Sequence, residues 1–371
     1  MQTLLAVLGT RPEAIKMAPV IQELSRRRGE IRSVICSTGQ HRQMLDQVFS
    51  LFQLQVDREL QVMQPNQTLA GLTARLTDAL DAVAAEVQPD WIIAQGDTTT
   101  VMVAAMVAFY RRIKFGHIEA GLRTGDLAHP FPEEFNRRVA DEVSTLLFAP
   151  TGKSRDTLLA EGFAAEKILV TGNTVIDALQ YVVKQPFDWA QSPLPNLPAE
   201  RRLVLVTAHR RESFGGPFEQ MCLALRDLAE RFGPQGVEFV YPVHLNPNVR
   251  KTVEPILGNT PNFRLLEPMD YLTLVHVMRR STLILTDSGG IQEEAPGLGV
   301  PVLVMRETTE RPEGVEAGVV RLVGTSRERI VSEASRLLAD EGARQQMIRG
   351  VNPYGDGKAA ERIVAAILNH G

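Results

Sequence analysis

The chain has 371 residues, which exceeds the usual size of a single hydrophobic core and favours two domains. A hydrophobic content of 44% with 23% charged residues is ordinary for a globular protein and excludes a largely disordered chain. The formal net charge of −4 gives no electrostatic reason to expect a nucleic acid or an anionic membrane as a partner. Any anion site must therefore be built locally.

The two cysteines, Cys36 and Cys222, lie far apart in segments that are predicted as a strand and a helix. The sequence therefore predicts neither a disulfide framework nor a zinc site. The N-terminal run LLAVLG is short and lacks a basic leader, so we expect a first strand there rather than a signal peptide. The longest later apolar run, Val101–Phe109, is too short to span a bilayer. We expect a cytoplasmic protein that binds no membrane.

Short apolar runs alternate with segments of helical period in the first half of the chain. The runs are LLAVLG, SVICSTG, DWIIAQGD, FGHIE, LLFAP and ILVTGN, and the helices are expected over Pro12–Arg28, His41–Phe52, Thr98–Arg112 and Val175–Val183. This rhythm predicts βαβ units and a parallel, doubly wound sheet.

A second series of strands begins at RLVLVTAHRRE and continues through VEFVYPVH, NFRLLEP, TLILTDSGG, VPVLVMR and VVRLVG. Between the two series lies Lys184–Glu200, which has four prolines and no apolar period, so it is predicted as a linker. The sequence thus predicts an α/β protein with two Rossmann-like doubly wound parallel sheets. The expected parts are domains at 1–183 and 201–352, the linker at 184–200, and a last helix in 353–371 that packs on the first domain.

Ligands of open parallel sheets bind outside the carboxyl ends of the strands, so polar residues after each predicted strand are candidates for a site. In the first half, Asp97 and Glu119 follow apolar strands, and Glu133 and Glu134 open a helix after Pro132. Carboxylates that are grouped in a desolvated cleft raise the pKa of at least one of them, as a general acid or a proton-relaying base requires.

Structural roles for the same carboxylates stay open at this point. Asp97 considered alone is suited to capping the next helix. For all of these carboxylates, Asp97 included, ion pairs with Arg123, Arg137 and Arg138 are the alternative.

Basic residues stand at several other strand ends. Arg11 and Lys16 in GTRPEAIK are placed either to face an anion at a helix start or to remain solvated. Arg311 in TERPEG is either a clamp for phosphate or carboxylate or a partner in a surface salt bridge. His209 and His244 follow strands of the second half, where histidine serves as a proton carrier, a phosphate contact or a cap.

The stretch DSGGIQEEAP combines a predicted helix start at Ser288 with the amides of Gly289 and Gly290, which suit a diphosphate. Glu293 and Glu294 follow about a turn later, where a carboxylate can accept hydrogen bonds from ribose hydroxyls. The seven histidines are scattered without metal-ligand spacing, so we expect no metal and no cofactor.

These motifs together resemble the non-hydrolysing UDP-N-acetylglucosamine 2-epimerases of bacteria. The resemblance runs in order from Leu8 to about Gly324 through LGTRPEAIKMAP, TGQHRQMLDQV, QGDTTT, HIEAGLRTGD, PFPEEFNRR, TAHRRESFG, YPVHLNPNV and TDSGGIQEEAPGLGVPVLVMRETTERPEG. It implies two Rossmann-like domains that face each other across a cleft, as in GT-B glycosyltransferases. It also implies a homodimer that interconverts UDP-N-acetylglucosamine (UDP-GlcNAc) and UDP-N-acetylmannosamine (UDP-ManNAc) for cell-surface polysaccharide synthesis.

The resemblance also implies roles for single residues. Asp97, Glu119 and Glu133 match the family's catalytic carboxylates, without an assignment of acid and base among them. The residues that match contacts to the sugar and to UDP are Arg11, Lys16, His209, Met269, Leu274, Ser288, Gly289, Gly290, Glu294 and Arg311. The residues that match the site of an activating second UDP-GlcNAc are Gln40, His41, Gln43, Arg210 and His244.

Two positions depart from the family pattern. Leu274 stands where members often carry an aromatic residue, so contact with the uracil ring is expected to be apolar rather than stacked. Asn66 stands where some members have a basic residue. This departure bears on activation by a second UDP-GlcNAc and not on catalysis.

The implied chemistry explains the residue types. No carbonyl acidifies the proton at C2 of the sugar, so inversion requires the bond between C1 and the UDP oxygen to break, and loss of the C2 proton then gives 2-acetamidoglucal and UDP. Carboxylates near C1 and C2 and a strong diphosphate site serve this path. Alternatives are a GT-B glycosyltransferase, a hydrolysing epimerase that releases ManNAc and UDP, and a catalytically silent nucleotide-sugar sensor.

Overall fold

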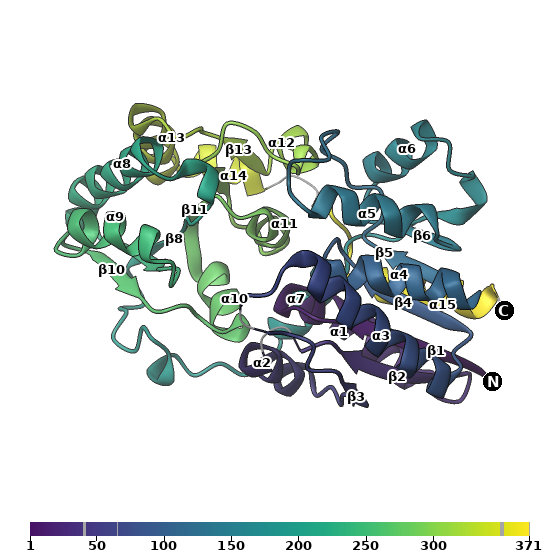
Figure 1. The fold of residues 1–371 in the computed structure, drawn as a ribbon. Coiled ribbons are helices and arrows are strands. Elements are labelled where there is room, and N and C mark those ends of the chain that lie inside the picture. Colours follow the sequence, from purple (N-terminus) through teal and green to yellow (C-terminus); the bar gives the residue numbers. More distant parts are fainter. Residues whose placement is uncertain (40–41, 65, 349–351, 371) are drawn as a thin grey trace. The chain divides into compact units, whose positions relative to one another are not determined.

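A computed structural model describes residues 1–39, 42–64, 66–348 and 352–370 (Figure 1). The chain divides into two compact units. The first unit comprises Met1–Gln180 together with Tyr354–Gly371, and the second comprises Tyr181–Pro353. The proline-rich segment 184–200, which the sequence predicts as a linker, is counted with the second unit and contains the short 3-10 helix η2 (Trp189–Gln191).

The first unit is built on a parallel sheet of seven strands in the order β3-β2-β1-β4-β5-β6-β7. These strands are β1 (Gln2–Leu8), β2 (Ile31–Ser37), β3 (Arg58–Glu59), β4 (Trp91–Gln95), β5 (Lys114–Ile118), β6 (Leu146–Ala149) and β7 (Ile168–Val170). The strand order reverses beside β1, so β1 and β4 flank the point where open α/β sheets place their ligands.

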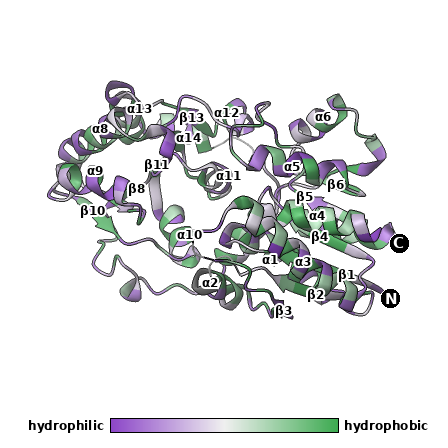
Figure 2. Cartoon of the chain, viewed as in Figure 1, coloured by the Kyte–Doolittle hydropathy of each residue, from purple (hydrophilic) through white to green (hydrophobic). Residues whose placement is uncertain are grey.

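Most helices of the first unit connect successive strands of its sheet, whereas α7 follows the last strand and α15 lies at the C-terminus. The helices are α1 (Arg11–Arg26), α2 (Arg42–Phe52), α3 (Leu69–Val87), α4 (Thr99–Arg111), α5 (Glu133–Glu142), α6 (Gly152–Ala160), η1 (Ala165–Lys167), α7 (Thr174–Val182) and the C-terminal α15 (Ala359–Asn369). The central strand β4 is buried along its whole length, as expected for a sheet that helices cover on both faces. Figure 2 shows the same hydrophobic character along β4 and α4.

The second unit repeats this architecture with a parallel sheet of six strands in the order β10-β9-β8-β11-β12-β13. The strands are β8 (Arg202–Thr207), β9 (Val237–Pro242), β10 (Phe263–Leu266), β11 (Ser281–Thr286), β12 (Val302–Val304) and β13 (Val320–Leu322). The helices are η3 (Arg211–Ser213), α8 (Gly216–Phe232), η4 (Gly233–Gln235), α9 (Pro247–Leu257), α10 (Tyr271–Arg280), α11 (Gly289–Gly297), α12 (Pro312–Glu316), α13 (Arg327–Ala339) and α14 (Glu341–Ile348).

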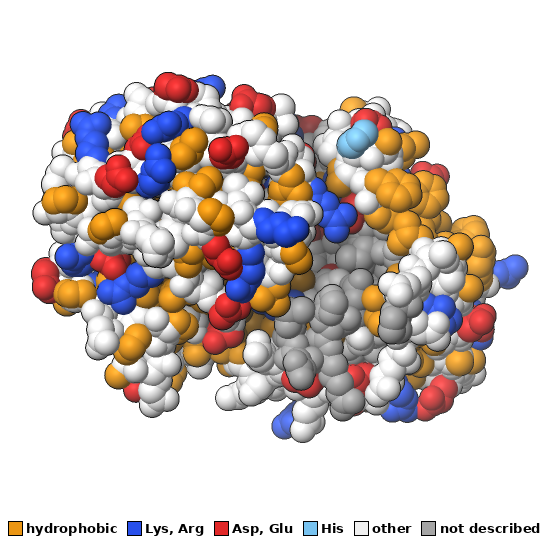
Figure 3. Space-filling model, turned by 60° about the vertical axis from the view of Figure 1, so that its left-hand side comes forward, with side chains coloured by type: hydrophobic (Ala, Val, Ile, Leu, Met, Phe, Trp, Pro, Cys, Tyr) orange, Lys and Arg blue, Asp and Glu red, His pale blue; other side chains and the backbone are white. Residues whose placement is uncertain are grey.

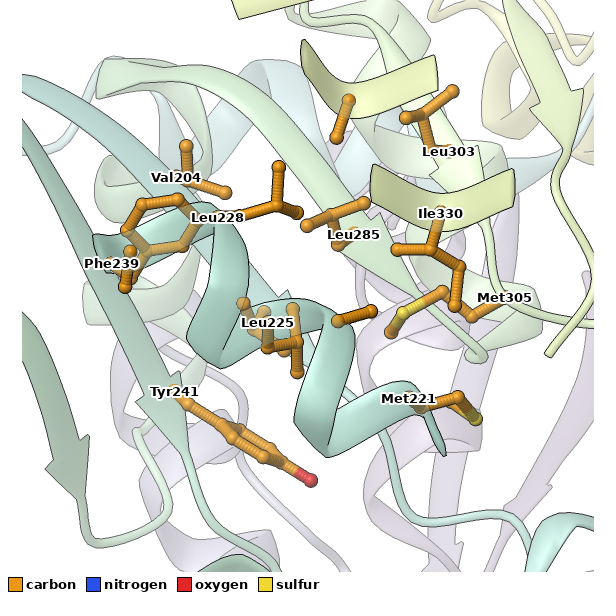
Figure 4. Packing of buried hydrophobic residues seen from close by; sticks show 14 of the residues in the cluster. Val204, Met221, Leu225, Leu228, Phe239, Tyr241, Leu285, Leu303, Met305 and Ile330 are labelled. Atoms are coloured by element: carbon orange, nitrogen blue, oxygen red, sulfur yellow. The ribbon is translucent and has the colours of Figure 1, made fainter. Parts of the chain in front are cut away.

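The core of the second unit lies between its sheet and the helices α8 and α13 (Figure 4). Leu225 and Leu228 of α8 are buried with Phe239 of β9 and Leu285 of β11. At about 25 cal/mol per Å² of buried apolar surface, each such side chain stabilises the fold by roughly 2 kcal/mol. This packing fixes the sheet whose strand ends carry the candidate nucleotide residues.

The C-terminal helix α15 belongs to the first unit although the second unit precedes it in the chain. The amides of Ala359 and Ala360 donate to the carboxylate of Asp177 at 3.2 and 2.9 Å, and Arg362 NH1 donates to the carbonyl of Thr171 at 2.9 Å. Near its other end, the His370 carbonyl accepts a hydrogen bond from Lys114 Nζ at 2.9 Å. The first unit is therefore completed by the last residues of the chain.

Charged side chains of both signs are interspersed over the face that Figure 3 shows. Among the described residues, no helix combines the length and the apolar character that a membrane span requires.

All twelve strands that the apolar runs predict are present, and the doubly wound parallel architecture is confirmed. In the first unit, the short edge strand β3 and the helices α3 and α6 lie outside those predictions.

Candidate active site

Asp97 lies in the tight turn between β4 and α4. Gly96 takes a φ of +92° there, a backbone conformation that favours glycine. The N-cap of α4 is Thr98, so the alternative that Asp97 caps this helix is wrong. Instead, the carboxylate of Asp97 forms an ion pair with Arg137, and its backbone carbonyl accepts a hydrogen bond from Asn136 Nδ2 at 2.9 Å.

The Asp97 side chain is nevertheless 30% exposed, whereas that of Arg137 is 8% exposed. Both partners of Asp97 come from the first turns of α5. The ion pair with an arginine, which the sequence leaves open as an alternative, is therefore present at Asp97. It holds the partly exposed carboxylate in place.

Glu119 follows β5 and adopts a φ of +73°, which is rare for a residue with a side chain. Its Oε1 lies 2.7 Å from Lys16 Nζ of α1, and its Oε2 accepts a hydrogen bond from the Gln95 side chain at the end of β4. Lys16 and Gln95 therefore hold both oxygens of the Glu119 carboxylate. Oε2 also lies 3.9 Å from the position that a Cβ on Gly96 would take, so the Glu119 carboxylate adjoins the turn of Asp97.

Glu133 and Glu134 differ sharply although they are neighbours at the start of α5. Glu134 is fully buried, accepts from the amide of Thr124 at 3.1 Å and pairs with Arg137 and Arg138, so it supports the loop before α5. Glu133 is half-buried, and within the described part of the chain it forms no hydrogen bond or ion pair. Of the two glutamates, Glu133 is the one that remains free to act on a ligand.

Glu13 is a site residue that the sequence analysis missed. Its Oε2 accepts from the amides of Gly9 at 2.6 Å and Thr10 at 2.8 Å, and the Thr98 hydroxyl donates to its Oε1. Burial raises the pKa of Glu13 above its ordinary value, although these hydrogen bonds oppose the shift. Glu13 thus joins the turn after β1 to the turn after β4.

The signal for Glu13 is visible in the sequence. Thr10 and Glu13 have the spacing of a capping box, in which each side chain binds the backbone of the other residue, and both of those hydrogen bonds are present. Arg11, the other candidate in this motif, is half-buried at the first position of α1.

In the second unit, the N-terminus of α11 follows β11, and Ser288 occupies its N-cap position without a capping hydrogen bond from the side chain. The guanidinium groups of Arg210 and Arg311 approach it: their NH2 nitrogens lie 3.6 and 4.0 Å from the position that a Cβ on Gly289 would take. A helix N-terminus that begins with two glycines and has two cations beside it is suited to a diphosphate.

Glu293 and Glu294 of α11 have separate partners. Glu293 is 1% exposed and forms an ion pair with Arg311 Nε, which ties the loop after β12 to the helix. Glu294 Oε2 accepts a hydrogen bond from the Tyr271 hydroxyl of α10 at 2.7 Å. Glu294 Oε1 lies 3.5 Å from the position that a Cβ on Gly290 would take, so this carboxylate reaches back toward the helix start.

His209 and His244 stack face to face, with ring centroids 5.1 Å apart and an interplanar angle of 7°. Asp287, which is fully buried at the end of β11, accepts from the amides of His209 at 2.6 Å and Arg210 at 2.8 Å. Burial and the neighbouring His209 lower the pKa of His244. Asp287 therefore positions the loop that carries a candidate phosphate contact, a role that the sequence analysis did not assign.

Arg210 also lies near an ionic cluster that is centred on the buried Arg306. Arg306 is 5% exposed and pairs with Glu212 and Glu310, both at 2.8 Å. Burial alone would raise the pKa of Glu310, but its hydrogen bonds and ion pair with Arg306 lower that pKa to about 2. Glu310 is 3.8 Å from Arg210 NH1, so the cluster links the loops after β8 and β12.

The remaining predicted residues are described in part. Met269 is 7% exposed, and Leu274 is half-buried in α10. Gln40 and His41 lie outside the described residues, and the side chain of Gln43 does as well. No set of three or more His, Cys, Asp or Glu side chains is arranged to hold a metal within the described ranges.

A family profile described as UDP-N-acetylglucosamine 2-epimerase matches residues 22–368. The chain belongs to this family of epimerases. The UDP-N-acetylglucosamine 2-epimerase of Escherichia coli K12 is 52% identical over 372 residues, which cover 99% of this chain and 98% of that protein. The family resemblance and the isomerase class that the sequence implies are thereby confirmed.

Solved structures agree with this assignment. The UDP-GlcNAc 2-epimerase of Neisseria meningitidis, in a crystal structure bound to UDP-GlcNAc, is 45% identical to this epimerase, with a TM-score of 0.92 and coverage of 99% of this chain and 100% of that one. The glycosyltransferase SnogD of Streptomyces nogalater is similar in fold alone, at 16% identity, a TM-score of 0.58 and coverage of 100% and 99%. The prediction of a GT-B-like pair of Rossmann-like domains is confirmed.

Proposed function

We propose that this epimerase interconverts UDP-GlcNAc and UDP-ManNAc by eliminating UDP and adding it back, without releasing free sugar. The observation that carries the proposal is the grouping of Asp97 and Glu119, which follow the adjacent strands β4 and β5. Their carboxylates are held by Arg137 and by Lys16, respectively. The structure of the Neisseria relative bound to UDP-GlcNAc supports this choice of substrate.

The proposed reaction has two half-steps. In the first, the bond from C1 to the UDP oxygen breaks and its electron pair leaves with UDP. A carboxylate then takes the C2 proton, and the C2–H electron pair becomes the C1–C2 double bond of 2-acetamidoglucal. In the second, a proton adds to the opposite face of C2 and UDP re-adds at C1, which yields the epimer.

We propose Asp97, Glu119 and Glu133 as the groups that exchange these protons. Both oxygens of Glu119 accept hydrogen bonds, and Asp97 has one cationic partner. Glu133 forms no hydrogen bond or ion pair within the described residues, so its carboxylate is available to contact the sugar. Lys16 and Arg11 are proposed to contact the substrate beside them.

For the second unit, we propose that the start of α11 binds the diphosphate. The amides of Gly289 and Gly290, with Ser288, Arg311 and His209, stabilise the negative charge that UDP gains when it leaves. Glu294 is proposed to hold the ribose hydroxyls, and Met269 and Leu274 to contact the uracil ring.

A second group of residues is proposed to bind a further UDP-GlcNAc molecule that activates the enzyme. The stack of His209 on His244 and the position of Arg210 beside α11 support an activator site in the second unit. The family resemblance adds Gln40, His41 and Gln43 to the proposed activator contacts. A sigmoidal dependence of the rate on UDP-GlcNAc concentration, and a hyperbolic one for H244A, would support this site. A hyperbolic curve for the unaltered enzyme would contradict it.

We also propose that the enzyme is a cytoplasmic homodimer that serves cell-surface polysaccharide synthesis. Sedimentation equilibrium at micromolar concentration tests the oligomer directly, because a monomer of 41.0 kDa would contradict the proposal.

Proton NMR in deuterated water tests the reaction. Incubation of the enzyme with UDP-GlcNAc should give UDP-ManNAc reversibly, with deuterium at C2 of both sugars. Free ManNAc would instead indicate a hydrolysing enzyme. Absence of both C2 exchange and product would exclude an epimerase and leave a glycosyltransferase or a sensor.

A further inference from the structure

His117 lies in the interior of β5 with a side chain that is 0% exposed, and each of its ring nitrogens faces an acceptor. Nδ1 is 2.5 Å from Asp141 Oδ1 of α5, and Nε2 is 2.7 Å from the backbone carbonyl oxygen of Gly96. A carbonyl oxygen has no hydrogen to donate, so Nε2 must carry a proton. The charge state of the ring therefore depends on which atom holds the proton between Nδ1 and Asp141.

The other contacts of Asp141 decide this point. Its Oδ2 lies 2.7 Å from Arg123 NH1 and accepts a weaker hydrogen bond from the amide of Gly121 at 3.3 Å. An acid that pairs with a guanidinium and also accepts from an amide is ionised. Asp141 therefore accepts from Nδ1–H, and the imidazole ring of His117 carries both protons and a positive charge.

Electrostatics agrees with the geometry. Burial by itself lowers the pKa of His117, and Arg123 lowers it further, but the ion pair with Asp141 and the two hydrogen bonds outweigh both and raise it. The pKa of Asp141 is correspondingly held below its ordinary value, because His117 and Arg123 outweigh the effect of its burial. Phe115, with its ring centroid 6.3 Å away in a stacked arrangement, adds no charge to the set.

This cluster connects the elements that carry the proposed catalytic carboxylates. Gly96 directly precedes Asp97, and Glu119 follows His117 by two residues on the same strand end. Gly121, whose amide binds Asp141, has a φ of +85°, and a Cβ there would come within 2.4 Å of the Ser154 carbonyl oxygen. Asp141 itself lies on α5, which begins at Glu133.

We propose that His117 is a positively charged positioning residue that holds the turn of Asp97 and the strand end of Glu119 in register through its two N–H groups. It does not touch the substrate. The hydrogen bond from an imidazolium to the Gly96 carbonyl is charge-assisted, so it resists rotation of the peptide that orients Asp97. The role rests on the proposed function, because it has a kinetic consequence only if these carboxylates perform the chemistry.

The charge state can be measured in the unaltered enzyme. Nitrogen-15 NMR of protein labelled in histidine, at pH 8, should show one of the seven histidines with protons on both ring nitrogens. Absence of this signal from H117Q would assign it, and D141N should convert it to a ring with a single N–H. If none of the seven histidines of the unaltered enzyme carries protons on both ring nitrogens at pH 8, the proposal is overturned, and this result does not depend on whether any variant folds.

Kinetics tests the positioning role. H117Q keeps one donor but cannot supply the charge or both N–H directions, so kcat should fall by about 100-fold for a carboxylate displaced by about an ångström. KM for UDP-GlcNAc should change little, because the proposed nucleotide contacts lie in the second unit. S144A is the matched control: it deletes a buried hydrogen bond to the Ala140 carbonyl at 2.7 Å beside the same helix and should lower stability while kcat is preserved.

The outcomes separate this inference from the proposed function. If the unaltered enzyme exchanges the C2 proton and folded H117Q retains its kcat, the positioning role is wrong while the epimerase assignment stands. If the unaltered enzyme shows no exchange, the proposed function fails and the positioning role fails with it. A doubly protonated His117 together with a selective loss of kcat in H117Q would support both.

Discussion

Lys16 Nζ lies 2.7 Å from Glu119 Oε1, although 103 residues separate the two in the sequence. Both side chains are largely buried, at 13% and 7% exposure. Helix α1 and the end of β5 therefore meet through a desolvated ion pair rather than through a surface contact. Removal of one partner of such a pair leaves the other charge without compensation.

The first prediction concerns this pair. K16M should lower the free energy of unfolding by about 3 kcal/mol, because the Glu119 carboxylate would be left buried without its cation. Epimerisation should slow as well. Urea unfolding followed by circular dichroism measures the stability change, with K167M at an exposed position as the control. A stability of K16M equal to that of K167M would show that the ion pair contributes nothing.

The second prediction concerns Asp97. D97N preserves the shape of the side chain but removes its capacity to exchange a proton, so kcat should fall by roughly 10³-fold. UDP affinity should be retained, because the proposed UDP contacts lie in the second unit. NMR of C2 exchange and titration calorimetry with UDP measure the two effects, and D156N on the exposed face of α6 is the control. Loss of UDP binding in D97N would favour a structural role for this residue.

The third prediction distinguishes the two glutamates of α11. E294A should weaken UDP binding by about 10- to 100-fold, the effect of losing hydrogen bonds to a charged group. E293A should instead lower the melting temperature, because it releases the guanidinium of Arg311 from its buried partner. Calorimetry with UDP and thermal unfolding of both variants check the contrast, with E328A in the exposed first turn of α13 as the control. Equal UDP affinity in E294A and E328A would rule out the ribose contact.

The fourth prediction concerns pH and Asp177, whose carboxylate accepts from the first amides of α15. Burial raises the pKa of Asp177 from 3.8 to about 6, so the folded protein binds this proton more tightly than the unfolded chain does. Its contribution to stability is fully present below about pH 4 and is lost as the pH rises through about 6. A pKa difference of about 2 corresponds to at most about 3 kcal/mol.

D177N should remove this dependence, since an asparagine oxygen still accepts from the two amides and never ionises. The difference in unfolding free energy between D177N and the unaltered protein should therefore grow in favour of D177N between pH 4 and pH 7. Denaturant unfolding at several pH values measures it. A difference that does not change with pH would contradict the raised pKa.

The strands were predictable because buried parallel strands are continuous apolar runs, and these differ plainly from the polar turns around them. The helix α3 was not singled out, since no polar motif adjoins it, and β3 has only two residues. The candidate carboxylates could be found because they stand at strand ends. Ligands of open parallel sheets bind outside the carboxyl ends of the strands, so these positions are candidates on topology alone.

The supporting residues were harder to find. His117 and Asp287 are buried at or near strand ends, where sequence does not distinguish a buried ionic role from ordinary packing. The partner of a carboxylate was also ambiguous. Arg137 binds Asp97, whereas Arg123 binds Asp141, and only the folded structure separates these pairings. The capping box of Thr10 and Glu13 can be recognised from the spacing of these residues, so this part of the hydrogen-bond network could be predicted from the sequence.

The chain enters the second unit after Gln180 and returns to the first at Tyr354. During synthesis, the whole second unit leaves the ribosome before the residues of α15 do. The apolar face of this helix, which includes Ile363, Val364 and Ile367, is fully buried in the finished protein. Until α15 is synthesised, the surface of the first unit that this helix covers stays exposed to solvent. In that interval the nascent first unit can bind chaperones or aggregate.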